Sequence, residues 1–186
     1  MNRRTVLTMS TLGVAGFFVA RYEQLVSVGA GKSSGAPAIV TIVEYSDAGV
    51  RQSVKDLPKL VKSESEWRGQ LTPIEFDVTR RAGTERAFTG ATWSLHDKGL
   101  YRCVCCDTAL FSSDTKFESG TGWPSFWAPI DKQNIEEERA FSLGIPRTAV
   151  SCRRCDAHLG HVFDDGPRPT GLRYCMNSAA LRFVKA

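Results

Sequence analysis

The sequence contains no dense stripe of lysine and arginine interleaved with aromatic residues, although its formal net charge is +4. Part of that charge lies at the N-terminus, in Arg3 and Arg4. Clustered basic residues are the electrostatic footprint of proteins that bind nucleic acid. Because that footprint is lacking, we expect no nucleic-acid partner.

The N-terminal region also lacks an apolar run long enough for a comfortable membrane span, which takes about 20 residues. The apolar stretch covers residues 6–20, after Arg3 and Arg4 and before Arg21. A charged start followed by a short apolar core is typical of a signal peptide. The order of Arg3, Arg4 and Leu7 resembles a twin-arginine signal. We therefore expect export to the periplasm or cell envelope.

The next segment, residues 29–37, is rich in glycine and serine and is expected to be a flexible linker. The small residues at 36–38 could be a cleavage site, but an uncleaved anchor stays open as an alternative. We assign residues 1–38 to a signal or anchor segment with its linker, and residues 39–186 to one domain. With 42% hydrophobic residues, the chain can bury a substantial core.

The start of this domain carries clear local signals. Residues 39–45 are rich in β-branched side chains and predict a strand. Ser63 with Glu66, and Thr72 with Glu75, match the capping box that starts a helix. We expect two short helices there, acting as packing elements.

Beyond Tyr101, short apolar runs alternate with clusters of glycine, proline, aspartate and serine, which is a β-sheet pattern. The content of ten Phe, four Trp, four Tyr, 16 Gly and eight Pro suits a loop-rich β domain. No internal repeat is visible apart from two C-x-x-C pairs. The sequence therefore predicts a mainly β fold preceded by short helices.

The two C-x-x-C pairs account for four of the six cysteines: Cys103 with Cys106, and Cys152 with Cys155. Four thiolates can surround a tetrahedral zinc ion, and a site with no open position is structural. Export also permits disulfides, and a single pair could be a redox dithiol. Two matched pairs favour a metal. Cys105 lies inside the first pair and its role stays open.

A second cysteine motif is Arg173-Tyr174-Cys175-Met176-Asn177. If this stretch is a strand, Arg173, Cys175 and Asn177 project to one face. A nearby cation lowers the pKa of a nucleophilic thiol, and an amide both donates and accepts hydrogen bonds. His158 and His161 lie upstream as candidates for proton delivery. A buried structural cysteine is the alternative.

Three aromatic residues, Trp123, Phe126 and Trp127, follow a glycine-rich turn. If exposed together, they would form an apolar wall suited to a methyl group or a thioether. Burial in the core is the alternative for such residues.

Taken together, these motifs resemble the B-type methionine sulfoxide reductases (peptide-methionine (R)-S-oxide reductases) over roughly residues 66–183. The matching segments include GWPSF, HLGHVFDDGP and RYCMNS. The resemblance implies a mainly β fold, with two antiparallel sheets in a β-tent arrangement, short N-terminal helices and a structural zinc site.

The resemblance also implies residue roles. Cys175 would be the nucleophile, Arg173 would favour its thiolate, and His161 and Asn177 would contact the sulfoxide oxygen with support from His158. The methyl group of the substrate would be received by Trp123, with Phe126 beside it. The zinc ligands would be Cys103, Cys106, Cys152 and Cys155.

The implied reaction is the thiol-dependent reduction of methionine-R-sulfoxide in proteins to methionine, through a Cys175 sulfenic acid. The implied partners are oxidised proteins and an external thiol reductant such as a thioredoxin-like protein, and we expect a monomer. A zinc-stabilised interaction module would not need Arg173, Cys175 and Asn177 on one face, and a disulfide-exchange protein would use a C-x-x-C pair catalytically.

One position departs from the family pattern. Many members carry a resolving cysteine where this chain has Thr121. With four cysteines on zinc, only Cys105 and Cys175 remain, and Cys105 sits between two ligands. We therefore expect an external thiol to reset Cys175 directly, without an intramolecular disulfide.

Overall fold

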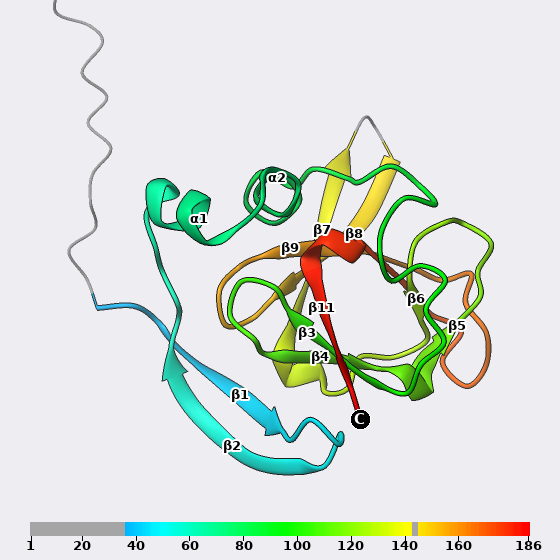
Figure 1. Cartoon of the computed structure of the whole chain (residues 1–186), viewed down its shortest axis with the longest axis horizontal. Helices are drawn as coiled ribbons and strands as arrows, with labels where there is room; N and C mark the ends of the chain where they lie inside the picture. The colour runs from blue at the N-terminus through cyan, green and yellow to red at the C-terminus, as the bar shows by residue number, and fades with distance from the viewer. Residues whose placement is uncertain (1–35, 143–144) are drawn as a thin grey trace, which may run out of the picture. The chain divides into compact units, whose positions relative to one another are not determined.

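The structure is a computed structural model that describes residues 36–142 and 145–186. The predicted signal and most of the linker lie outside the described residues. Within the described ranges, strands predominate and two short α-helices precede most of them (Figure 1). No helix in this part of the chain is long and apolar enough to cross a membrane.

The helices lie in the first half and between strands: α1 (Glu64–Gln70), α2 (Pro73–Arg81), and the 3₁₀ turns η1 (Ser113–Thr115), η2 (Lys132–Asn134) and η3 (Ser178–Ala180). The strands are β1 (Ile39–Tyr45), β2 (Arg51–Pro58), β3 (Gly99–Cys103), β4 (Ala109–Ser112), β5 (Lys116–Phe117), β6 (Ser125–Phe126), β7 (Ile135–Ser142), β8 (Ile145–Cys152), β9 (His158–Phe163), β10 (Arg173–Met176) and β11 (Leu181–Lys185).

Two antiparallel sheets form the body of the fold, as predicted. One has six strands in the order β5-β6-β10-β9-β8-β7, and the other has three in the order β11-β3-β4. A third sheet of two strands, the β1–β2 hairpin, was not expected. The strand predicted at residues 39–45 is β1, but its partner β2 has a mostly exposed, polar sequence that gives little strand signal.

The two larger sheets meet through a cluster of aromatic rings. Phe126 of β6 lies 4.9 Å from Tyr101 and 4.5 Å from Phe111, measured between ring centroids. Phe111 lies 5.8 Å from Tyr174 of β10 in the same way. All four side chains are at most 1% exposed. Aromatic pairs stabilise a fold by more than their buried apolar area alone would give. This cluster therefore fixes β6 and β10 against the three-stranded sheet.

Both predicted capping boxes are present. The Ser63 hydroxyl accepts the Glu66 N–H at 3.3 Å, and the Glu66 carboxylate accepts the Ser63 N–H at 2.7 Å. Thr72 and Glu75 make the same reciprocal pair at the start of α2. Such pairs satisfy the N–H groups that a helix start leaves free. The helices then bury one face, and α2 packs against β9 and η3.

A buried amide helps to attach the β1–β2 hairpin to the body of the fold. Asn134 Oδ1 accepts the Val43 N–H at 2.8 Å, and Asn134 Nδ2 donates to the carbonyls of Val43 and Ala109, each at 2.8 Å. Both Asn134 and Val43 are fully buried. A buried amide with these partners fixes the hairpin beside β4.

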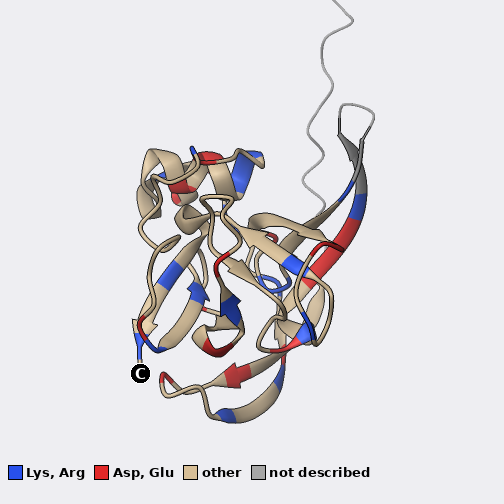
Figure 2. Ribbon diagram, turned by 90° about the vertical axis from the view of Figure 1, so that its right-hand side faces the viewer, with Lys and Arg blue, Asp and Glu red and all other residues tan. Residues whose placement is uncertain are grey.

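Charged residues of both signs are interspersed along the described elements (Figure 2). Several form exposed ion pairs, such as Arg68 with Glu64 one helical turn away, at 2.7 Å, and Lys55 with Glu44 across the hairpin, at 2.7 Å. Exposed pairs of this kind contribute little to stability. The aromatic interface between the sheets therefore matters more for holding the site in place.

Candidate functional site

Cys175 lies in the interior of the six-stranded sheet. On β10 it pairs with Ser125 of β6 on one side and with His161 of β9 on the other. Side chains that are directly opposite in neighbouring strands project to the same face. Ser125, Cys175 and His161 therefore form a row with the thiol in its centre.

The neighbouring residues in these strands point the other way. Phe126 pairs with Tyr174, and both enter the aromatic core. Phe126 is fully buried and is not among the described residues that line the cavity beside Cys175. This placement corrects the expectation that Phe126 contributes to the substrate pocket. In the pairing of β6 with β10, the neighbouring Ser125 lies opposite Cys175 and so projects to the same face as the thiol.

A cavity of about 290 Å³ opens in front of the thiol. Five of the predicted site residues line it: Trp123, His161, Arg173, Cys175 and Asn177. Larger clefts of about 450 Å³ and 380 Å³ lie elsewhere and contain none of these five. Trp127, the third aromatic residue of the predicted wall, lines the largest of these clefts. Only Trp123 of the three faces the thiol cavity.

Arg173 is held in a forked ion pair that the sequence did not reveal. Its Nε and Nη2 atoms donate to the two carboxylate oxygens of Asp165, each at 2.8 Å. The guanidinium also lies over the Phe163 ring, 4.4 Å from its centroid. Bidentate pairing and stacking are the geometries that favour arginine over lysine. Asp165 therefore orients Arg173 and partly neutralises its positive charge.

The pKa of the Cys175 thiol reflects competing influences. Burial raises it above the ordinary value, and this effect is the largest. The charge of Arg173 and hydrogen bonds from Thr121 and Ser125 act in the opposite direction. Arg173 thus lowers the pKa of Cys175, as predicted, but the effect of burial is larger. The thiolate needs further stabilisation inside the cavity.

Both histidines of the site are shifted towards the neutral form. Burial, followed by the charge of His161, lowers the pKa of His158 to about 4. Burial, followed by the charge of Arg147, lowers the pKa of His161. The two rings lie 5.2 Å apart between centroids, and His158 Nε2 has no hydrogen-bond partner within the described ranges. At neutral pH, His161 therefore presents a neutral imidazole to the cavity.

Asn177 is placed by contacts with distant backbone. Its Oδ1 accepts the Glu85 N–H at 3.0 Å, and its Nδ2 donates to the Leu159 carbonyl at 3.1 Å. An amide nitrogen carries two hydrogens, so one remains for a ligand. Asn177 is 3% exposed and is one of the residues that line the cavity.

Glu85 connects several parts of this wall and was missed in the sequence. Its carbonyl accepts the Trp123 indole N–H at 3.1 Å. Its carboxylate accepts the N–H groups of Ser178 and Ala179 at 2.6 Å and 2.8 Å. Glu85 is 6% exposed, and all these partners are far away in the sequence. No local pattern could have indicated them.

Glycines allow the strands and loops to approach closely here. A Cβ atom on Gly160 would lie 2.2 Å from the Cys175 carbonyl oxygen, so β9 can pass β10 only without a side chain. Gly122 has φ +86°, in the left-handed region, and its carbonyl accepts the Phe88 N–H at 2.8 Å. These glycines set the position of the loop that carries Thr121 and Trp123.

The four cysteines of the C-x-x-C pairs come together in a cluster, and none of them lines this cavity. Their Sγ atoms all lie within 4.8 Å of one another. The Sγ atoms of Cys103 and Cys155 are 3.7 Å apart, and those of Cys106 and Cys152 are 3.5 Å apart. Tetrahedral zinc with Zn–S bonds of about 2.3 Å requires S···S distances of about 3.8 Å. The cluster therefore fits a zinc ion.

The six cysteines all lie in the described ranges and all carry free thiols, so the disulfide alternative is not the one adopted. The two C-x-x-C turns also share one conformation. The Cys103 carbonyl accepts the Asp107 N–H at 2.8 Å, and the Cys152 carbonyl accepts the Asp156 N–H at 2.9 Å. Both aspartates have left-handed φ angles, 64° and 56°. Each C-x-x-C pair therefore presents its thiols from an equivalent tight turn.

A cavity with one thiol, an arginine and an imidazole, together with a four-cysteine cluster that shares none of its lining residues, defines a protein with a reactive cysteine and a cluster that could hold a metal ion. Residues 71–185 match the SelR domain family. The chain belongs to this family, whose curated relatives are named as methionine sulfoxide reductases of the B type.

The similarity to these relatives is high. A protein named peptide methionine sulfoxide reductase MsrB from Hahella chejuensis is 57% identical over 130 residues, covering 70% of this chain and 94% of that protein. The protein of the same name from Herminiimonas arsenicoxydans is 55% identical, covering 67% of this chain and 91% of that protein. The chloroplastic peptide methionine sulfoxide reductase B1 of Arabidopsis thaliana is 59% identical, covering 64% of this chain and 59% of that protein.

Proposed function

We propose that this protein reduces methionine-R-sulfoxide in oxidised proteins to methionine, using the thiol of Cys175. The observation that carries the proposal is the position of Cys175, between Ser125 and His161 at the wall of a cavity shared with Trp123 and Arg173. The membership in the family of named methionine sulfoxide reductases supports the same reaction.

The first half-reaction moves two electrons from Cys175 to the substrate. The thiolate attacks the sulfoxide sulfur while a proton is delivered to the sulfoxide oxygen, because that oxygen leaves the sulfur only as it is protonated. The attack forms a bond between the Cys175 sulfur and the methionine sulfur. The protonated oxygen then passes to the Cys175 sulfur as both bonds from the methionine sulfur, to oxygen and to Cys175, break. One of the two released electron pairs forms the new S–O bond and the other stays on the methionine sulfur, which leaves methionine and a Cys175 sulfenic acid.

The cavity residues divide this work. Trp123 presents an apolar ring for the methyl group of the substrate. The free hydrogen on Asn177 Nδ2 and the neutral imidazole of His161 are placed to bind the sulfoxide oxygen and to pass it a proton, directly or through water. Arg173, oriented by Asp165, favours the thiolate. His158 supports His161 from its buried side.

An external thiol completes the cycle. It attacks the sulfenic sulfur of Cys175 and releases water, and a second thiol then breaks the mixed disulfide and restores the Cys175 thiol. Thr121 occupies the place of the usual resolving cysteine, and its side chain cannot form a disulfide. We therefore propose direct resetting by a thioredoxin-like or similar reductant.

Zinc, held by Cys103, Cys106, Cys152 and Cys155, would supply stability and no reaction step. Four thiolates leave no open coordination position. The ion would join the turn after β3 to the turn after β8, and so would tie the three-stranded sheet to the six-stranded sheet.

We also propose that the chain acts as a monomer outside the cytoplasm, where it repairs envelope proteins. The N-terminal pattern of Arg3, Arg4 and the following apolar stretch supports export. A reporter fused after residue 37 should be exported, and Arg3→Lys with Arg4→Lys should block export through the twin-arginine route. Cytoplasmic retention of the unaltered fusion would contradict the proposal.

The reaction itself is tested with a peptide that contains racemic methionine sulfoxide, a dithiol reductant and chiral analysis of the remaining sulfoxide. We expect the R epimer to be consumed and the S epimer to remain. Cys175→Ser protein is the control and should consume neither. Equal consumption of both epimers, or of the S epimer alone, would contradict the proposed function.

A further inference from the structure

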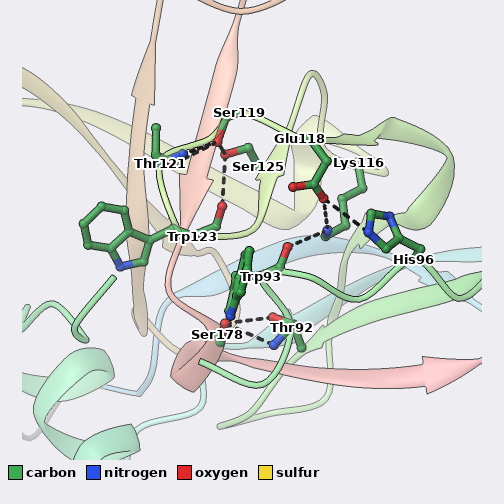
Figure 3. Close-up of polar contacts among 10 residues, drawn as sticks. All are labelled: Thr92, Trp93, His96, Lys116, Glu118, Ser119, Thr121, Trp123, Ser125 and Ser178. Atoms are coloured by element: carbon green, nitrogen blue, oxygen red, sulfur yellow. Dashed lines mark hydrogen bonds and ion pairs between the residues drawn. The ribbon is translucent and has the colours of Figure 1, made fainter. Parts of the chain in front are cut away.

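Three hydroxyl groups form a connected chain that ends at the reactive sulfur. Ser125 Oγ lies 2.7 Å from Ser119 Oγ, and Ser119 Oγ lies 2.8 Å from Thr121 Oγ1. Thr121 Oγ1 lies 4.0 Å from Cys175 Sγ, within hydrogen-bonding range for sulfur. Figure 3 shows Ser119 between Thr121 and Ser125, on the loop that leads to Trp123. We call Ser125, Ser119 and Thr121 the hydroxyl chain.

Each hydroxyl has one hydrogen, so the chain has two consistent orientations. In the first, Ser125 donates to the Trp123 carbonyl at 3.3 Å, Ser119 donates to Ser125, and Thr121 donates to Ser119. Thr121 Oγ1 then faces Cys175 as an acceptor, which suits a thiol S–H.

In the second orientation, every hydroxyl is reversed. Ser125 donates to Ser119, Ser119 donates to Thr121, and Thr121 donates to the sulfur, which suits a thiolate. The reversal gives up only the contact between Ser125 and the Trp123 carbonyl, which at 3.3 Å is the longest oxygen–oxygen contact in the set. Ser125 is fully buried, and the remaining partner beside its hydroxyl is the Cys175 sulfur itself, opposite it in the sheet.

We propose that the hydroxyl chain reverses when Cys175 ionises, so that Thr121 donates a hydrogen bond to the thiolate and acts as a catalytic residue. The proton of the thiol leaves to water in the cavity. Chains of hydrogen bonds polarise one another in a low-dielectric interior, so Ser119 and Ser125 strengthen the bond that Thr121 makes. In this proposal Thr121 stabilises the thiolate, in addition to occupying the position where other members of the family have a resolving cysteine.

A hydrogen-bond donor beside Cys175 would stabilise a thiolate that the rest of the cavity stabilises only weakly. Burial disfavours the thiolate of Cys175. The charged and titratable groups that face it are Arg173 on its own strand, His161 on β9 and Arg147 on β8. Arg173 shares its charge with Asp165, and His161 is neutral at neutral pH. A hydroxyl donor adds thiolate stabilisation without a further charge.

The test is the pH dependence of Cys175 alkylation by iodoacetamide, followed by mass spectrometry of the Cys175 peptide in metal-loaded protein. Thr121→Val keeps the shape of the side chain and removes the hydroxyl. We expect the apparent pKa to rise and the alkylation rate at pH 7 to fall about threefold to tenfold. Thr121→Ser should restore the unaltered profile, and Ser119→Ala should give a smaller shift.

Thr84→Val is the matched control, because it removes a hydroxyl from the same cavity wall but not from the hydroxyl chain. Its profile should match that of the unaltered protein. A Thr121→Val profile identical to the unaltered one, or a shift that Thr121→Ser leaves in place, would overturn the inference. Thr121→Ala gives the same comparison if Thr121→Val does not fold.

The inference rests on the proposed function only for the identity of the nucleophile. Alkylation measures ionisation of Cys175 without any sulfoxide. If the protein failed to reduce sulfoxides but Thr121→Val still shifted the alkylation profile, the proposed function would fail and the hydroxyl chain would stand. The two failures can therefore be told apart.

Discussion

Cysteine occupies two contrasting environments in this chain, the cavity around Cys175 and the cluster formed by the two C-x-x-C pairs. In the cluster, Cys103, Cys152 and Cys155 are at most 1% exposed, and their thiols face one another. Cys175 is only partly buried and faces an arginine, an imidazole and a hydroxyl. Four thiols together suit a metal, whereas one thiol among polar groups suits attack on a substrate.

The two environments are also built in different ways. The cluster is made by two local turns of the same conformation, so short sequence patterns determine most of its geometry. The cavity is made by the register of β6, β10 and β9 and by a loop far away in the sequence, through Glu85. The reactive site therefore depends on long-range packing throughout, whereas within the four-cysteine cluster each C-x-x-C pair is shaped by its own local turn.

The largest expected effect separates the two environments completely. Cys175→Ser should leave no measurable sulfoxide reduction, because an alcohol is not ionised near neutral pH. The same variant should keep about one zinc per chain and an unchanged melting temperature, since the cluster does not contain Cys175. Metal analysis and calorimetry check this. A loss of zinc in Cys175→Ser would show that the two sites are not independent.

The converse change should act on stability. Cys152→Ser removes one of four ligands, and the free energy of binding a structural zinc, on the order of 10 kcal/mol, is coupled to folding. We expect loss of the metal and a large fall in the melting temperature, measured by metal analysis and circular dichroism. Metal-free protein of full stability would contradict the zinc assignment.

Glu85→Gln should act on the cavity and leave the cluster intact. A glutamine can accept from only one of the N–H groups of Ser178 and Ala179, and its NH₂ group opposes the other. We expect a loss of about 2 kcal/mol of stability. The backbone carbonyl and N–H of residue 85 bond to Trp123 and Asn177, so a shift of this backbone should displace both side chains and lower kcat/KM for methionine sulfoxide about tenfold.

A positioning role is separable from a general loss of stability. If Glu85 positions Trp123, Glu85→Gln should reduce the preference for methionine sulfoxide over ethionine sulfoxide, which has a larger alkyl group. Loss of folded protein would lower both rates equally. Asn134→Ala, which removes buried hydrogen bonds at the hairpin, is the control for stability and should keep the preference. An unchanged preference in Glu85→Gln would leave Glu85 with a structural role only.

These two environments differ in how far the sequence alone predicts them. The capping boxes, the strand at residues 39–45 and the four-cysteine cluster were predicted, and the structure confirms each. Nearby residues define the boxes, the strand and each C-x-x-C turn, and the matched spacing of the two pairs indicates that they meet. The prediction for Phe126 was wrong because Phe126 and Ser125 project to opposite faces of β6. Only the register with β10 determines which of the two shares the face of Cys175. Asp165 and Glu85 were missed because their partners are brought near only by the fold.

The cavity should also respond to acid in its own way. Because the pKa of His158 is lowered to about 4, the folded protein binds fewer protons than the unfolded chain between that value and about 6.5. The neutral, buried state of His158 therefore has no cost above about pH 6.5. As the pH falls from about 6.5 towards 4, the unfolded chain binds a proton that the folded protein does not, and the free energy of unfolding decreases. Between pH 7 and pH 5.5 we expect a loss of about 1 kcal/mol from this group.

Denaturation in urea at the two pH values measures this loss, and His158→Gln is the control. The variant should lose less stability on acidification than the unaltered protein, because it has no imidazole to protonate there. Acid release of zinc would affect both proteins alike and cancels in the difference. An equal pH dependence in the two proteins would assign the effect to the cluster.

The smallest expected effect concerns Cys105, the cysteine that belongs to neither function. It is 3% exposed, and its carbonyl accepts the Gln70 Nε2–H at 2.7 Å, so its loop is tied to α1. A disulfide needs Cα atoms within about 7 Å of each other, and Cys105 is not among the described residues around the Cys175 cavity. Cys105→Ser should therefore recycle with an external thiol at the normal rate.

Thr121→Cys provides the positive counterpart. The Thr121 hydroxyl is 4.0 Å from Cys175 Sγ, so a thiol in its place is near enough to attack the sulfenic acid and release water. One turnover without reductant should then leave a 121–175 disulfide in Thr121→Cys and a labelled sulfenic acid in the unaltered protein. A Cys105–Cys175 disulfide in the oxidised unaltered protein would instead show that the metal-binding turn reaches the cavity. The separation of the two environments would then be incomplete in the oxidised state.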